Sequence, residues 1–196
     1  MISIKADVQR LTRGLNAIGQ RQMPFATATA LNDMAAAGAT AVRRRMPNTF
    51  DRPVPFTMNA VTIQTANKSR LTARVFVKDR QAGYLDVQET GGAGRPKKTA
   101  FVIPEAIGVN QHGNMPRGAL QRAKNRKGVF VGQVGKAAGF FFRAVGKAPV
   151  LLARFVRKAT YKPRFGFRDR VTQTVKAVAP VALRQALAKA MATARR

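Results

Sequence analysis

The sequence contains no cysteine and no tryptophan, one histidine, and only eight Asp and Glu residues among 196. Without cysteine the chain forms no disulfide, no thiolate metal site and no cysteine nucleophile, and its redox compartment stays undetermined. Its hydrophobic content of 45% nevertheless suffices for a packed core, so wholesale disorder is not expected.

The scarcity of titratable side chains also argues against catalysis, because an acid/base enzyme needs such groups to converge in a pocket. The one histidine, His112, lies in a Gly- and Asn-rich stretch and is interpreted as an exposed bystander. Asp79, Asp86 and Glu89 are the best candidates for a Mg²⁺ site, but we interpret them as solvated acids that balance nearby bases. We therefore expect no enzymatic activity, no metal and no cofactor.

What the chain has in excess is positive charge: 36 Lys and Arg give a formal net charge of +28. The excess is uneven, since residues 1–94 hold 13 basic and 6 acidic side chains and residues 95–196 hold 23 and 2. Such a surface attracts polyanions, so nucleic acid or strongly acidic protein surfaces are the expected partners, contacted mainly by the C-terminal half.

No segment predicts a targeting signal or a membrane span. The first residues lack an apolar stretch of signal-peptide length, and the most apolar stretch, 137–156, is interrupted by Arg143, Lys147 and Arg154. A soluble cytosolic product that does not contact a membrane is expected.

Apolar spacing predicts helices at both ends. Residues 4–18 carry an apolar stripe of Ile4, Val8, Leu11, Leu15 and Ile18. A second, Ala-rich helix is expected from Pro24 to about Met46, ended by Pro47. Its small residues allow another element to pack closely, within the subunit in the favoured interpretation or else between subunits. Helical spacing returns over 167–194, where Pro180 is expected to interrupt the helix and Val181, Leu183, Leu187 and Met191 continue its periodicity.

The middle of the chain predicts strands. Residues 59–65 and 71–78 are expected to pair as an antiparallel hairpin, and 99–103 to form a short strand. Three apolar runs at 128–134, 139–145 and 149–156 predict a meander. The basic loop 91–98 and the arm 108–128 are expected to be exposed. We therefore predict a single α+β domain over 1–196: helices at 1–46 and 167–194 packed on a mainly antiparallel sheet built from 56–156.

The two exposed basic segments supply the candidate contacts to a polyanion. These are Arg95, Lys97, Lys98, Arg117, Arg122, Lys124, Arg126 and Lys127. The loop Gly91-Gly92-x-Gly94 lacks the spacing of a nucleotide-binding fingerprint. Phe140, Phe141 and Phe142 lie among basic residues as base-stacking platforms do, but core packing is the favoured interpretation.

Three segments resemble the minor tail protein Z, or tail-completion, family of tailed bacteriophages. They are IKADVQRLTRGLNAIGQRQMPFATATALNDMA (4–35), with its Ala30-Leu31-Asn32, then VLLARFVRKATYKPRFGF (150–167) and FRDRVTQTVKAVAPVALRQALAKAM (167–191). Their order, covering about two-thirds of the chain, carries the resemblance, and the arm 108–128 has no counterpart.

The resemblance implies a non-enzymatic virion protein at the head-proximal end of the tail, made in the host cytoplasm. It implies a homo-oligomeric ring, expected to be hexameric, which contacts neighbouring tail and neck proteins and packaged DNA in the channel. The alternative is a nonspecific nucleic-acid-binding protein of ribosomal or nucleoid type, although no helix-turn-helix, zinc-finger or RNA-recognition signature is found. A nuclease is disfavoured by the few carboxylates.

Overall fold

The structure is a computed structural model that describes residues 22–94, 96 and 99–194. It is an α+β protein with helices towards both ends of the described chain and antiparallel sheets between them, which is the fold class that the sequence predicts. The expected helix at 4–18 lies outside the described residues. The described residues form two compact units: unit 1 contains 22–46, 56–82 and 166–194, and unit 2 contains 47–55, 83–94, 96 and 99–165. The division into units does not test whether the chain folds as a single domain, which remains a prediction.

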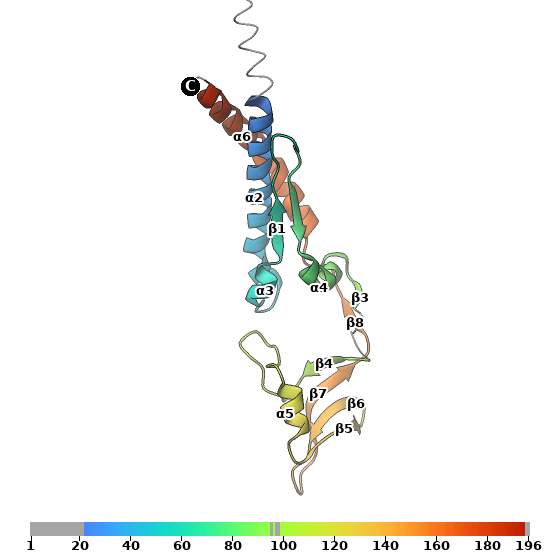
Figure 1. Ribbon diagram of the computed structural model, residues 1–196. Coiled ribbons are helices and arrows are strands. Elements are labelled where there is room, and N and C mark those ends of the chain that lie inside the picture. Colours follow the sequence, from blue (N-terminus) through green and yellow to red (C-terminus); the bar gives the residue numbers. More distant parts are fainter. Residues whose placement is uncertain (1–21, 95, 97–98, 195–196) are drawn as a thin grey trace, which may run out of the picture. The chain divides into compact units, whose positions relative to one another are not determined.

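Unit 1 is organised by two long helices, α2 (Met23–Thr49) and α6 (Phe167–Ala194) (Figure 1). Their contact is built from small residues: Ala26 and Ala30 of α2 and Ala186 and Ala190 of α6 are all at most 5% exposed. Further along, Gly38 faces Val171, whose Cγ1 atom lies 3.3 Å from the position that a Cβ would take. The helices are therefore antiparallel, and the prediction that the Ala-rich helix packs closely within the subunit is confirmed.

Both prolines that were expected to end or interrupt a helix lie inside one. Pro47 falls in the last turn of α2, where the loss of one backbone donor does not prevent two more helical residues. Pro180 lies within α6, which continues because packing against α2 holds the helix on both sides of it. Pro180 is also exposed, so water can satisfy the carbonyl that loses its donor.

The predicted hairpin is confirmed as β1 (Val61–Gln64) paired antiparallel with β2 (Arg74–Val77). Asn32 of α2 holds the connecting segment: its Oδ1 accepts the N–H of Ala66 at 2.7 Å, and its Nδ2 donates to the Ala66 carbonyl at 3.1 Å. The side chain thus takes the place of a strand partner. The short helix α3 (Pro55–Met58) precedes β1.

Helix α4 (Asp79–Thr90) was not anticipated, because 56–156 was expected to contain strands and loops only. Its buried positions are Gln81, Leu85 and Gln88, so two of the three inward positions carry a polar residue. Gln88 is satisfied by the backbone and side chain of Arg164, whose Nε donates to Gln88 Oε1 at 2.7 Å. An apolar helical period is consequently absent from this stretch.

The loop expected at 91–98 is wrong in part, since Gly92–Gly94 form β3 and pair antiparallel with β8 (Ala159–Tyr161). The glycines serve packing here: a Cβ on Gly94 would lie 2.5 Å from the Tyr161 ring. The glycine run suggests a flexible loop in the sequence, but it forms a strand in which Gly94 leaves room for an aromatic ring.

The main sheet of unit 2 is antiparallel with strand order β4-β7-β6-β5. Its strands are β4 (Phe101–Pro104), β5 (Val129–Val134), β6 (Ala137–Phe142) and β7 (Val150–Val156). The predicted short strand before Pro104 and the predicted three-stranded meander are both confirmed. A register shift between Phe140 and Phe141 interrupts the β6–β7 pairing.

Candidate nucleic-acid interface

The arm expected at 108–128 is largely exposed, but it is not devoid of regular structure. It contains helix α5 (Ala119–Lys124), which begins after Gly118 in a left-handed conformation with φ of 76° and ends at Asn125. Ala119, Leu120 and Ala123 are half-buried, whereas Arg122 and Lys124 are exposed. Helix α5 has fewer than two turns, so its apolar residues do not repeat often enough for the sequence to predict a helix there.

Helix α5 and its flanks bring together the candidate cations of the arm. Arg122 Nη1 donates to the carbonyl of Arg117 at 3.1 Å, and Arg126 and Lys127 follow the helix directly. All five side chains are exposed: Arg117, Arg122, Lys124, Arg126 and Lys127. We call these five residues the α5 cluster. The other three candidates, Arg95, Lys97 and Lys98, lie outside the described residues.

Aromatic rings of the sheet hold two cations of the α5 cluster. The Lys124 ammonium lies 5.6 Å from the centre of the Phe140 ring, and the Arg126 guanidinium lies 4.2 Å from that of Phe142. Both distances are within the range of cation–π attraction, which orients the cation without neutralising it. A ring contact thus keeps each charge available to an anion from solvent.

Arg143 is a further exposed cation of unit 2 that sequence reasoning did not select. Its guanidinium lies 5.3 Å from the ring of Phe130, which stacks on Phe141 at 5.6 Å. Side chains of consecutive strand residues alternate between faces, so Arg143 lies on the opposite face of the sheet from Phe142 and the α5 cluster. The signal that could have identified it is its position directly after three phenylalanines.

The phenylalanines themselves are not a base-stacking surface. Phe140 and Phe141 are 5% and 3% exposed, and Phe140 packs edge-on against Phe155 at 5.4 Å. The prediction of core packing is confirmed for these two residues.

Little negative charge balances unit 2, because residues 47–55 and 83–165 contain 17 Lys and Arg but only four Asp and Glu. Two of those acids already have arginine partners: Asp51 contacts Arg52 at 3.1 Å, and Glu105 contacts Arg154 at 3.0 Å. Within the described ranges, no member of the α5 cluster has a carboxylate partner. The charge of the cluster is therefore free to act on a ligand.

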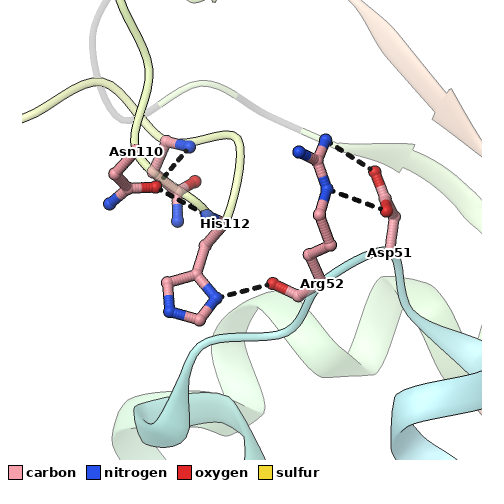
Figure 2. A network of polar contacts seen from close by, with 5 residues as sticks. Asp51, Arg52, Asn110 and His112 are labelled. Atoms are coloured by element: carbon pink, nitrogen blue, oxygen red, sulfur yellow. Dashed lines mark hydrogen bonds and ion pairs between the residues drawn. The ribbon is translucent and has the colours of Figure 1, made fainter.

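His112 belongs to a polar network rather than to a catalytic arrangement (Figure 2). Its Nδ1 lies 3.0 Å from the carbonyl oxygen of Arg52, and Asn110 Oδ1 accepts the backbone N–H of His112 at 3.0 Å. The hydrogen bond from Arg52, and then its charge, hold the pKa of the exposed Asp51 carboxyl below its usual value. The network fixes the loop at 110–114 against residues 51–52 of the same unit.

The carboxylates considered for Mg²⁺ all lie on one helix, α4. In the part of the chain that the structure describes, no three His, Cys, Asp or Glu side chains are grouped so that they could hold a metal ion. No helix among these residues is long and apolar enough to cross a bilayer.

The candidate functional groups in the described residues are thus exposed, positively charged side chains. Comparison with known protein families, with curated proteins and with solved structures finds no match to this chain.

Proposed function

We propose that this chain is a non-enzymatic, structural virion protein of a tailed phage that acts at the head-proximal end of the tail. It completes the tail and joins it to the head, as part of an oligomeric ring near the DNA channel, after synthesis in the host cytoplasm. The observation that carries the proposal is the α5 cluster, a set of exposed cations that have no carboxylate partner among the residues the structure describes. The resemblance of segments 4–35, 150–167 and 167–191 to tail-completion proteins supplies the location.

The cluster suits a ligand that is read by charge alone. Its side chains are Lys and Arg on a short helix and a turn. Of the two rings that they contact, Phe140 is buried and Phe142 is half-buried, so contacts to phosphate are favoured over contacts to bases. DNA passing through a channel requires this type of contact, because its sequence changes continuously. Acidic surfaces of neighbouring tail and neck proteins are the second class of partner for the same charges.

The same cluster also favours a second candidate, a nonspecific nucleic-acid-binding protein of ribosomal or nucleoid type. The two functions differ in what the cell or phage loses without the protein. Neighbouring genes for a tail tube and a tape measure support the first candidate, whereas ribosomal genes support the second.

The decisive experiment is a nonsense mutation in this gene within its phage, followed by electron microscopy of lysates. We expect filled heads and separate tails of normal length, with infectivity restored by the wild-type chain supplied from a plasmid. Tails of abnormal length would instead implicate the protein in length control. Normal virions, or a defect in translation or nucleoid structure, would contradict the proposal.

Strand β5 offers a contact through which copies of the chain can assemble. It is an edge strand that pairs only with β6 among the described residues, and its six residues carry no charge. The Arg143 N–H donates to the Gly128 carbonyl, so alternation along the ladder turns the N–H and C=O groups of Val131 and Gln133 outward. Edge strands normally carry a charge, a proline or a bulge that prevents pairing, and β5 has none of these.

We expect Val131→Lys to weaken self-association about tenfold or more, because a charge on an edge strand opposes pairing with another strand. Val131 is 54% exposed, so the lysine should not disturb the sheet. Val145→Lys is the matched control, since Val145 is fully exposed in the turn between β6 and β7. Native mass spectrometry would compare the ring populations, and identical populations for Val131→Lys and wild type would exclude the β5 edge.

A further inference from the structure

Helix α6 carries a row of large apolar side chains that are about half exposed in the described part of the chain. Leu183, Leu187 and Met191 follow one another at intervals of four residues and are 51%, 45% and 41% exposed. We call them the α6 stripe. Single exposed leucines are common on protein surfaces, but a continuous row along two helical turns marks a contact site.

The α6 stripe lies directly beside the buried face of the helix. At about 100° per residue, Leu183 and Leu187 follow Ala182 and Ala186 around the helix axis. The alanines contact α2, so the apolar face of α6 is wider than the surface that α2 covers. Another apolar helix at this position would complete a three-helix layer in unit 1.

We propose that residues 4–18 of the same chain cover the α6 stripe. This segment, outside the described residues, carries an apolar row of Ile4, Val8, Leu11, Leu15 and Ile18 at helical spacing. It precedes α2, whose first turns contact the last turns of α6 through Ala26, Ala30 and Ala190. The end of the segment is therefore tethered beside Met191 by only a few residues that include Gly19.

The connection also fixes the register. Because α2 and α6 are antiparallel, a segment that returns along α2 to reach Met23 would run parallel to α6. Leu15 would then lie at the level of Leu187, and Leu11 at the level of Leu183. The rows match in length, since Leu183 to Met191 spans about 12 Å and Leu11 to Ile18 about 10 Å of helix.

The absence of cysteine makes a direct disulfide test possible in the full-length protein. We expect Leu15→Cys with Leu187→Cys to form an intramolecular disulfide on mild oxidation of dilute protein. The matched control pairs Ala17→Cys with Leu187→Cys, because two residues along a helix place Ala17 about 200° away from Leu15. A covalent dimer would show that a second copy covers the stripe, and equal cross-linking of both pairs or none in either would also overturn the proposal.

A second readout covers the case in which a cysteine variant fails to fold. Trypsin cleavage after Arg10 and Arg13 should be slow in the wild type and about tenfold faster in Leu187→Glu, because a charge on the stripe would release the segment. Val181→Glu is the control, since Val181 is 52% exposed but lies about 120° around the helix from Leu187. Equal cleavage rates in wild type and Leu187→Glu would refute the docking. This outcome does not depend on the proposed function.

Discussion

Reversing the charge at Arg122, Lys124, Arg126 and Lys127 to Glu is expected to weaken binding to mixed-sequence duplex DNA about a thousandfold near physiological salt. Each lysine or arginine that neutralises a phosphate releases counterions and adds about 0.9 to the slope of log K against log salt. The four side chains are exposed and have no carboxylate partner in the described structure, so all four can contact phosphate. The slope should therefore fall by about 3 to 4.

A matched variant separates this surface from the overall charge of the chain. Charge reversal at Arg44, Lys176, Arg184 and Lys189 changes the net charge equally, at exposed positions of α2 and α6. We expect this variant to lose much less affinity and to keep most of the salt slope. Fluorescence anisotropy at several salt concentrations would measure both. Equal losses in the two variants would mean that charge is read without regard to position, and salt-independent, sequence-selective binding would favour a dedicated nucleic-acid-binding protein.

In the phage, the same change at the α5 cluster is expected to leave tails of normal length with impaired joining to heads or impaired DNA delivery. Wild-type infectivity would remove the cluster from the mechanism.

The helices and strands that sequence reasoning predicted are those whose apolar residues repeat at one clear period. The meander 128–156 alternates or runs apolar between turns, and the hairpin is marked by Val75 and Val77, so both are recovered. Helix α4 could not be found in this way, because Gln81 and Gln88 occupy inward positions that a periodicity reading assigns to solvent. The strand β3 was not predicted because the Tyr161 ring, a partner distant in the sequence, requires the glycine at position 94.

Helix α6 shows that the period of apolar residues predicts a helix more reliably than it predicts which face of that helix is buried. Leu183, Leu187 and Met191 gave the helical signal, yet Ala182, Ala186 and Ala190 make the contact with α2. Small side chains let two helix backbones approach closely, and this preference depends on the partner helix rather than on hydrophobicity alone.

For the candidate interface, the sequence was sufficient to select the charged arm but not its arrangement. Composition identified Arg117 to Lys127 as basic and exposed, which the structure bears out. The contacts of Lys124 and Arg126 with Phe140 and Phe142 depend on how α5 packs beside the sheet, and no local pattern records that packing. Arg143 was missed for the same reason, since its ring partner, Phe130, is on the neighbouring strand.

Gly139→Ala is expected to destabilise the main sheet of unit 2 by about 3 kcal/mol or more, near the upper end of the effects of single substitutions. Gly139 lies in β6, between Gly132 of β5 and Arg154 of β7. A Cβ at this position would collide with the backbone carbonyl oxygen of Ala153, a fully buried residue that cannot move without separating β6 from β7.

Gly132→Ala is the matched control, because Gly132 is the direct cross-strand partner of Gly139. A Cβ on Gly132 would meet only the Phe130 ring, at 3.6 Å, which is an ordinary van der Waals contact. Removing a glycine from an unstrained strand position should change stability by less than about 1 kcal/mol. Urea denaturation followed by circular dichroism, with amide exchange resolved for β6 and β7, would compare the variants. Equal protection of these strands in Gly139→Ala and Gly132→Ala would show that β7 moves to accommodate the added methyl group. The close approach of β6 and β7 at Gly139 would then not be required for the stability of the sheet that carries Phe140 and Phe142, the ring partners of the α5 cluster.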